Sequence, residues 1–233
     1  TYRDLGQEKK AKEAFMRAIE ENPDYAEAHF NLGLMAAKQR KFEEAVTHLK
    51  TSARLNPRDI ETYFELGRIF ILQGEKINAQ LALKTLLQLD ETRVDARCLL
   101  AHTIMSIGKY DEALQEYQIA LENDPQDTQI LNGIGKIHDK NGRFTLALEY
   151  LYKAIKINET DIVTLTSLGS THQSLGDLDT ANDYYKRVLQ LEPSAIFAEQ
   201  CALFLNLNNP NYTLDELFTL HTDLRGHHDK PEF

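Results

Sequence analysis

The sequence has no tryptophan, only two cysteines and no long apolar run. No stretch approaches the roughly 18 consecutive apolar residues that a membrane-spanning helix needs. The N-terminus is charged and lacks the apolar segment of a secretory signal. Cys98 and Cys201 lie in helical patterns, which favours reduced, packed thiols over a disulfide. These absences predict a cytoplasmic protein without a membrane-bound role.

Positive charge is also scarce. The chain carries 26 Lys and Arg against 36 Asp and Glu, for a formal net charge of −10. Nucleic acids and anionic membrane surfaces bind clustered Lys and Arg, so neither is an expected partner. The sequence also lacks a glycine-rich phosphate loop, a metal-spaced Cys/His set and a nucleophile-elbow motif. We therefore expect no catalysis by this chain, no cofactor and no metal.

Small residues are present, and they recur along the chain with a constant period. A period of about 34 residues is typical of a helix–turn–helix unit that stacks into a solenoid. One glycine series has Arg40 in its second slot, a second series replaces one glycine by alanine, and an alanine series is complete. The three series are Gly6, Gly74, Gly108, Gly142 and Gly176; Gly33, Gly67, Ala101, Gly135 and Gly169; and Ala11, Ala45, Ala79, Ala113, Ala147 and Ala181.

The period divides the chain into an incomplete unit, a series of full units and a different C-terminal segment. Apolar residues within each unit follow the i, i+3, i+4, i+7 spacing of amphipathic helices. The incomplete first unit suggests that a preceding segment has been cut away. The predicted division is a truncated repeat at 1–25, five repeats at 26–59, 60–93, 94–127, 128–161 and 162–195, and a helical extension with a flexible tail at 196–233.

Local signals agree with this division. Glycine between the two helices of a unit accepts the left-handed backbone of a helix C-cap, so the turn at Arg40 is expected to be strained or differently shaped. Gly33 is expected to face Ala45, and Gly67 to face Ala79, which lets the paired helices approach closely. Proline marks the ends of most units because it cannot continue the preceding helix, at Pro23, Pro57, Pro125 and Pro193.

The first helix of each stacked unit should line the concave face of the array. Its exposed positions are apolar near the N-terminus and polar further on, which suits an extended or helical peptide with apolar anchors. The alternative is that missing repeats or the curvature of the array cover these side chains. The predicted groove residues are Phe30, Leu34, Phe64, Arg68, Ile71, His102, Met105, Asn132 and Lys136.

Two further series allow two readings each. Glu27, Glu61 and Asp95 form an acidic ladder that either selects a basic ligand or is a solvated edge. His138 and His172 should be stacked by adjacent repeats, as packed side chains at a usually aromatic position or as part of a metal or proton-relay site. No third ligand lies in register with the two histidines, which favours packing.

These residues together resemble the tetratricopeptide repeat family over residues 1–195. The resemblance implies an all-α, right-handed superhelical solenoid of antiparallel helix pairs that binds other proteins. The chaperone-binding members of that family hold a C-terminal carboxylate with Lys and Asn in the groove. Phe30 and Leu34 occupy the matching first positions here, so this carboxylate clamp is not expected.

A narrower resemblance covers a short segment at the C-terminal end. Leu203–Leu207, Pro210, Tyr212–Phe218 and His221 are similar to the junction between repeats and catalytic domain in the O-GlcNAc transferase family. The resemblance implies a recognition arm, with the catalytic lobes beyond Phe233. The asparagine ladder of the animal enzymes is not matched, because the corresponding positions read Asn31, Glu65, Leu99, Gly133 and Ser167.

The sequence thus predicts a protein- or peptide-binding scaffold without catalytic machinery. The first hypothesis is the substrate- or partner-recognition arm of a larger O-GlcNAc transferase-like protein. The alternative is a stand-alone adaptor that assembles a multiprotein complex. Self-association through the N-terminal half-repeat or the C-terminal extension is a further possibility.

Overall fold

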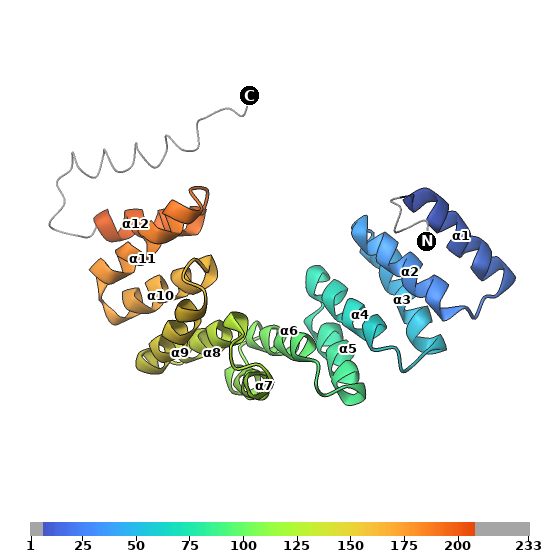
Figure 1. The fold of residues 1–233 in the computed structure, drawn as a ribbon, viewed down its shortest axis with the longest axis horizontal. Helices are drawn as coiled ribbons and strands as arrows, with labels where there is room; N and C mark the ends of the chain where they lie inside the picture. The colour runs from blue at the N-terminus through green and yellow to red at the C-terminus, as the bar shows by residue number, and fades with distance from the viewer. Residues whose placement is uncertain (1–6, 208–233) are drawn as a thin grey trace, which may run out of the picture. The chain divides into compact units, whose positions relative to one another are not determined.

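The computed structural model describes residues 7–207, and all regular secondary structure in that range is helical (Figure 1). The chain divides into two compact units, Thr1–Asn123 and Asp124–Phe233. The first unit contains α1 (Glu8–Glu21), α2 (Ala26–Lys38), α3 (Phe42–Leu55), α4 (Ile60–Gln73), α5 (Lys76–Leu89), α6 (Val94–Met105) and α7 (Tyr110–Asn123). The second unit contains α8 (Thr128–Lys140), α9 (Phe144–Ile157), α10 (Ile162–Leu175), α11 (Leu178–Leu191) and α12 (Ile196–Leu207). The tail and most of the C-terminal extension lie outside the described residues.

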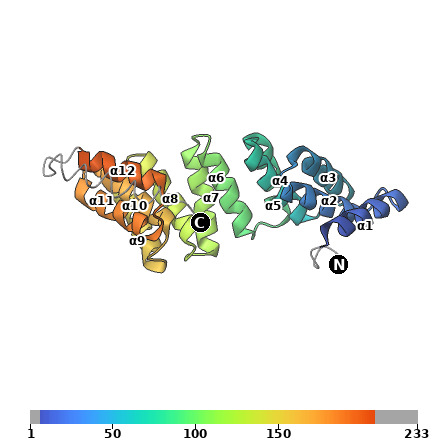
Figure 2. The ribbon, with the colours of Figure 1, turned by 90° about the horizontal axis from the view of Figure 1, so that it is seen from above.

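The helices repeat with the period of the sequence. Each first helix begins one full period after the previous one, at Ala26, Ile60, Val94, Thr128, Ile162 and Ile196. The second helices keep the same spacing from Glu8 to Leu178. Within each unit, the two helices of a repeat pack against each other, and each second helix also contacts the first helix that follows it (Figure 2). The architecture is a solenoid of antiparallel helix pairs.

The second helices bury one stripe each, whereas the first helices are buried on several sides. In α3 the buried residues are Ala45, Leu49 and Ser52, which share one face at the i, i+4, i+7 spacing. In α8, by contrast, buried residues occur at nearly every position from Ile130 to His138. Helix α8 packs against its partner α9 and against α10, the first helix of the next repeat.

The turn inside each repeat uses a left-handed residue. Gly74, Gly108, Gly142 and Gly176 have φ between 70° and 81°. Arg40 has φ of 59° and is the one non-glycine residue with positive φ among residues 7–207. The turn at Arg40 therefore has the same left-handed backbone as the glycine turns, and its Cβ makes that backbone strained.

The link between repeats is a tight turn that explains its proline. The Asp59 amide donates to the Asn56 carbonyl over 3.2 Å, so Pro57 is the second residue of a four-residue turn. Proline favours this position because its ring fixes the φ angle that the second residue of such a turn requires. The Asp161 amide makes the same bond to Asn158 without a proline in the turn. Turn geometry is therefore kept at the repeat end whether or not proline is present.

The glycines of the first helices face a different neighbour from the one expected. A Cβ added to Gly67 would lie 2.8 Å from Cγ of Leu83, and one added to Gly33 would lie 2.7 Å from Cγ of Leu49. The side chain opposite each glycine is therefore the leucine one turn after the expected alanine. For Gly33, Ala45 contributes only its carbonyl oxygen, at 3.3 Å. The absence of a side chain on glycine leaves the space that this leucine fills.

Candidate functional site

Seven of the nine predicted groove residues lie in the first unit, on the face made by α2, α4 and α6. We call this surface the first-helix face. Helix α4 contacts both α2 and α6, so exposed positions of successive repeats lie next to one another. Arg68 and His102 are exposed there, whereas the apolar members are half-buried: Phe30, Leu34, Phe64, Ile71 and Met105. Phe30 and Ile71 also pack against the hydrophobic core beneath.

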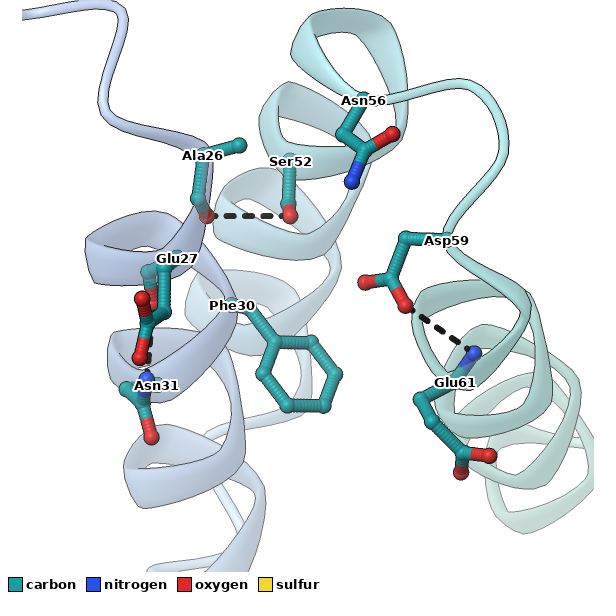
Figure 3. A pocket seen from close by; sticks show the side chains of 8 residues that line it. All are labelled: Ala26, Glu27, Phe30, Asn31, Ser52, Asn56, Asp59 and Glu61. Atoms are coloured by element: carbon teal, nitrogen blue, oxygen red, sulfur yellow. Dashed lines mark hydrogen bonds between the residues drawn. The ribbon is translucent and has the colours of Figure 1, made fainter.

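A pocket of about 420 Å³ opens between α2 and the start of α4. Its lining consists of Ala26, Glu27, Phe30, Asn31, Ser52, Asn56, Asp59 and Glu61. We call it the Phe30 pocket. Figure 3 shows the Phe30 ring pointing from α2 into the space before α4, where Asp59 and Glu61 lie. The pocket thus combines an aromatic ring with three carboxylates, which suits a side chain with an apolar stem and a positive end.

The carboxylates of the Phe30 pocket are held in different ways. The Asp59 side chain caps α4 by accepting from the Glu61 amide over 3.3 Å, and it also accepts from the Thr62 hydroxyl. Glu27 accepts from the Tyr25 hydroxyl over 3.1 Å, and this hydrogen bond raises the pKa of Tyr25. Glu27 and Glu61 are both exposed. The rim of the pocket is therefore acidic and open to solvent.

A second pocket, of about 280 Å³, lies further along the same two helices. Leu34 lines it together with Arg68, which is one of the other predicted groove residues. Arg68 donates to Glu65 over 2.9 Å, an ion pair within α4. Glu65 also lines the pocket, and the remaining lining residues are Ala37, Lys38, Phe42, Ile69 and Leu72. The first-helix face therefore carries two neighbouring hollows between α2 and α4.

Arg93 lies over the ring of Phe64 on the first-helix face. Its guanidinium carbon lies 5.2 Å from the centre of the Phe64 ring. It donates to Glu61 over 2.6 Å, and two of its nitrogens bind Asp95 at 2.9 Å each. The hydrogen bonds to Asp95 and Glu61 raise the pKa of Arg93, and Arg93 lowers the pKa of Asp95. Two of the three acidic-ladder residues, Glu61 and Asp95, are thus paired with an arginine of the same chain.

In the second unit, the structure places Asn132 in the interior. Asn132 is 3% exposed, and its amide group donates to the hydroxyls of Thr164 and Ser167 over 3.2 Å each. The side chain joins α8 to α10, because its partners lie on the first helix of the next repeat. Its direct role is therefore to hold two repeats together, and this placement corrects the expectation of a groove contact.

Lys136 lies one turn after Asn132 and is half-buried. Burial lowers the pKa of its ammonium group, and the charge of Asp161 opposes part of that effect. Of the two groove residues predicted in the second unit, Lys136 is the one with an accessible side chain.

The two histidines in register are packed against tyrosines of their own repeats. His138 stacks on Tyr150 with ring centres 5.7 Å apart, and His172 stacks on Tyr184 at 5.6 Å. His172 also binds the Tyr152 hydroxyl at 2.9 Å and Asp177 at 3.0 Å. Both histidines are buried, at 6% and 7% exposure. Each ring therefore fills an aromatic position in its own helix pair and is not stacked on the other histidine.

The sequence interpretation missed Asp59 and Arg93 as parts of this surface. The predicted groove positions all lie within first helices, whereas Asp59 and Arg93 each lie just before a first helix begins. A signal was present, because this position reads Tyr25, Asp59, Arg93, Asp127 and Asp161 in successive repeats. The single arginine in that series departs from the helix-capping residues around it.

Two kinds of feature are absent from residues 7–207. No helix in that range is both long enough and apolar enough to cross a membrane. The same residues contain no group of three or more His, Cys, Asp or Glu side chains arranged to hold a metal ion. The adjacent histidines His227 and His228, which the sequence alone would allow to bind a metal weakly, lie in the C-terminal tail, outside the described residues.

Comparison with known proteins decides the family. Models of the tetratricopeptide repeat match residues 1–60, 98–162 and 163–194. The chain belongs to the tetratricopeptide repeat family. A solved structure of such a repeat protein, YrrB, titled as having an unusual peptide-binding site, superposes with a TM-score of 0.65 at 18% identity, covering 81% of this chain and 97% of that one. At this identity the likeness supports the tetratricopeptide fold alone.

Two curated relatives share part of the tetratricopeptide region. Hsp70-Hsp90 organizing protein 1 of Glycine max is 25% identical over 134 residues, which is 58% of this chain and 23% of the relative. BBSome complex member BBS4 of Bos taurus is 27% identical over 140 residues, which is 60% of this chain and 27% of the relative. The match thus spans about a quarter of the length of these relatives.

Proposed function

We propose that this tetratricopeptide chain is an adaptor that docks a peptide segment of a partner protein on its first-helix face. The observation that carries the proposal is the pair of hollows between α2 and α4, lined by Phe30 and by Leu34. Half-buried apolar side chains beside exposed charges are typical of peptide grooves. The face therefore offers apolar anchors and a charged rim to one extended or helical segment.

The named relatives support an adaptor role. One is called an organizing protein of Hsp70 and Hsp90, and the other a member of the BBSome complex. The first name describes a protein that organizes others, the second a member of a complex, and YrrB is titled for its peptide-binding site. By this analogy the role of the present chain is assembly without catalysis. A cytoplasmic location, inferred from two cysteines that the structure leaves as thiols, is part of the proposal.

The resemblance to the O-GlcNAc transferase junction is the observation behind a second candidate. In that case the chain is the recognition arm of a glycosyltransferase. Of the residues that carry the resemblance, only Leu203–Leu207 lie within the described structure, in α12. The length of the parent protein separates the two candidates, because a transferase continues for about 400 residues with two nucleotide-binding α/β halves.

A quantitative pull-down tests the adaptor proposal. The bait is the full chain, compared with a Phe30→Ala/Phe64→Ala double variant. The matched control is Ile77→Ala/Leu81→Ala, because these side chains are 83% and 66% exposed on the second helix α5. We expect partners to be lost from the double variant and kept by the control.

Retention of the same partners by both variants would overturn the proposal and place binding on another surface. Circular dichroism and thermal melting of each bait separate lost binding from lost folding. Because Phe30 contacts the core, Leu34→Asp provides an independent variant at a half-buried position of the face.

A further inference from the structure

Two neighbouring sites in the first unit are related by one repeat, and only one of them contains its own cation. Phe30, Glu27 and Glu61 correspond to Phe64, Glu61 and Asp95 when the sequence is shifted by one repeat. In the Phe64 site, the residue before the next helix is Arg93. In the Phe30 pocket the corresponding residue is Asp59, so the pocket gains a carboxylate where its neighbour has a guanidinium.

The Phe64 site shows how these side chains hold a guanidinium. The Arg93 group lies over the aromatic ring at 5.2 Å from its centre. It makes a two-pronged contact to Asp95 and a third hydrogen bond to Glu61. Its side chain is 22% exposed, although both carboxylates are about half exposed. Aromatic stacking combined with fork-like pairing is a geometry that arginine satisfies and lysine does not.

The Phe30 pocket has carboxylates at the corresponding positions of α2 and α4, with Glu61 in the place of Asp95. Its ring points into a hollow of about 420 Å³, within the range of ligand pockets. Glu27 stands where Glu61 stands in the Phe64 site, and Glu61 stands where Asp95 stands. Arg93 donates to Oε1 of Glu61, so Oε2 of the same carboxylate can accept from a second guanidinium. We propose that the Phe30 pocket binds an arginine side chain of the partner peptide, held over Phe30 between the carboxylates of Glu27 and Glu61.

This inference rests on the proposed function for the peptide but makes a narrower statement about its chemistry. The aliphatic stem of the arginine packs on the Phe30 ring, and the guanidinium binds the acidic rim. Asp59 adds negative charge at the base of the site while it caps α4. The pocket therefore selects partner segments that carry arginine, in keeping with the net charge of −10 on the chain.

The test uses a single arginine as the probe, so that it does not depend on the identity of the partner. The full chain is labelled with ¹⁵N and titrated in the millimolar range with N-acetyl-arginine N-methylamide at physiological ionic strength. We expect amide shifts at and around Glu27, Phe30 and Glu61. The citrulline derivative, which is uncharged and of similar shape, should bind at least about 10-fold more weakly, and the lysine derivative should lie between.

Two reciprocal substitutions, which swap the residues at the corresponding positions 59 and 93, make the test specific. Asp59→Arg should place a guanidinium over Phe30, as Arg93 lies over Phe64, and should abolish the shifts. Arg93→Asp should open the Phe64 site and add a second set of shifts around Phe64 and Asp95. An aspartate at position 93 can cap α6 as Asp59 caps α4, so the helix start is retained.

Equal shifts with arginine and citrulline would overturn the inference, and so would shifts spread evenly over the acidic surface. Binding that survives Asp59→Arg would also overturn it. The outcomes are independent of the adaptor proposal. A partner that docks on the face without arginine selection refutes only the present inference, whereas arginine binding without any partner on the face refutes only the docking.

Discussion

At the scale of single residues, Arg40 has a backbone conformation that glycine adopts in four other repeats. Its φ of 59° lies in the left-handed region, where a Cβ costs roughly 1–2 kcal/mol. No Cβ clash explains the glycines at the other turns, because a Cβ on Gly74 would meet nothing within 4 Å. The preference for glycine at this position therefore comes from the backbone alone.

We expect Arg40→Gly to stabilise the first unit by about 0.5–1 kcal/mol, because relief of backbone strain exceeds the greater flexibility of glycine in the unfolded chain. Urea unfolding followed by circular dichroism measures the change. Gly74→Ala is the reverse experiment and should cost about 1 kcal/mol. A loss of stability in Arg40→Gly would show that the arginine side chain makes a compensating contact.

We expect His138 to make the stability of the fold depend on pH. Burial lowers its pKa below the ordinary value, helped by the positive charge of Arg143 and opposed by Glu149. The native state thus favours the neutral ring, and below the ordinary histidine pKa the unfolded chain binds more protons. The free energy of unfolding should therefore fall as pH drops from about 8 to 5.5.

The variant His138→Phe should show a smaller fall over that range, because phenylalanine occupies the same position in another repeat as Phe70. Unfolding free energies at several pH values, measured for both proteins, provide the comparison. Parallel curves for variant and wild type would show that His138 contributes nothing to the pH dependence. His48, whose pKa is also lowered by burial, is present in both proteins and cancels.

At the scale of elements, the sequence predicts the helix pairs well and their contacts less well. The repeat period places the starts of both helices in every repeat, because glycine, proline and the apolar stripes each signal a boundary. The prediction that Gly67 faces Ala79 was wrong. Leu83, one turn later, fills the space beside Gly67 that a side chain would otherwise occupy. Such a reach depends on the separation of two helices, which a pattern within each helix does not contain.

Contacts between repeats were harder still to predict. Asn132 looks like an exposed groove residue when counted along α8 alone, yet Thr164 and Ser167 of the next repeat bury it. Arg93 likewise joins Glu61 of one repeat to Asp95 of the next. The sequence pattern of a single repeat does not contain these partners, because they lie in the next repeat.

The packing of a helix pair leads to a second stability prediction. Gly67→Ala should destabilise the first unit by about 1–2 kcal/mol, because its Cβ would overlap Leu83, which is fully buried. The overlap itself costs about 2–3 kcal/mol, and the gain in helix propensity from glycine to alanine offsets about 1 kcal/mol of it. Chemical unfolding measures the net effect.

Ala101 provides the control, because it is the natural alanine at the same position of the third full repeat. Ala101→Gly should also lose stability. Ala101 is buried in the packed helix pair, so its removal loses packing, and glycine makes the unfolded chain more flexible. A stabilised Gly67→Ala protein would mean that α4 and α5 separate easily, which contradicts the close packing of these two helices.

At the scale of the whole molecule, the chain is an acidic solenoid whose first unit offers a recessed, partly aromatic face. Its stability should be roughly the sum of repeat and neighbour terms. Substitutions at exposed face positions can therefore change binding without unfolding distant repeats. This separation makes the face accessible to direct mapping with small, local changes.

The most direct test of the docking face is site-specific photo-cross-linking in cell extract. A photoreactive phenylalanine analogue replaces Leu34 on the first-helix face or, as a matched control, Leu81 on α5, which is 66% exposed. Cross-linked partners are identified together with the peptide that carries the link. We expect links from position 34 to one segment of a partner and none to that segment from position 81. A partner segment that is linked from position 81 and not from position 34 would contradict docking on the first-helix face.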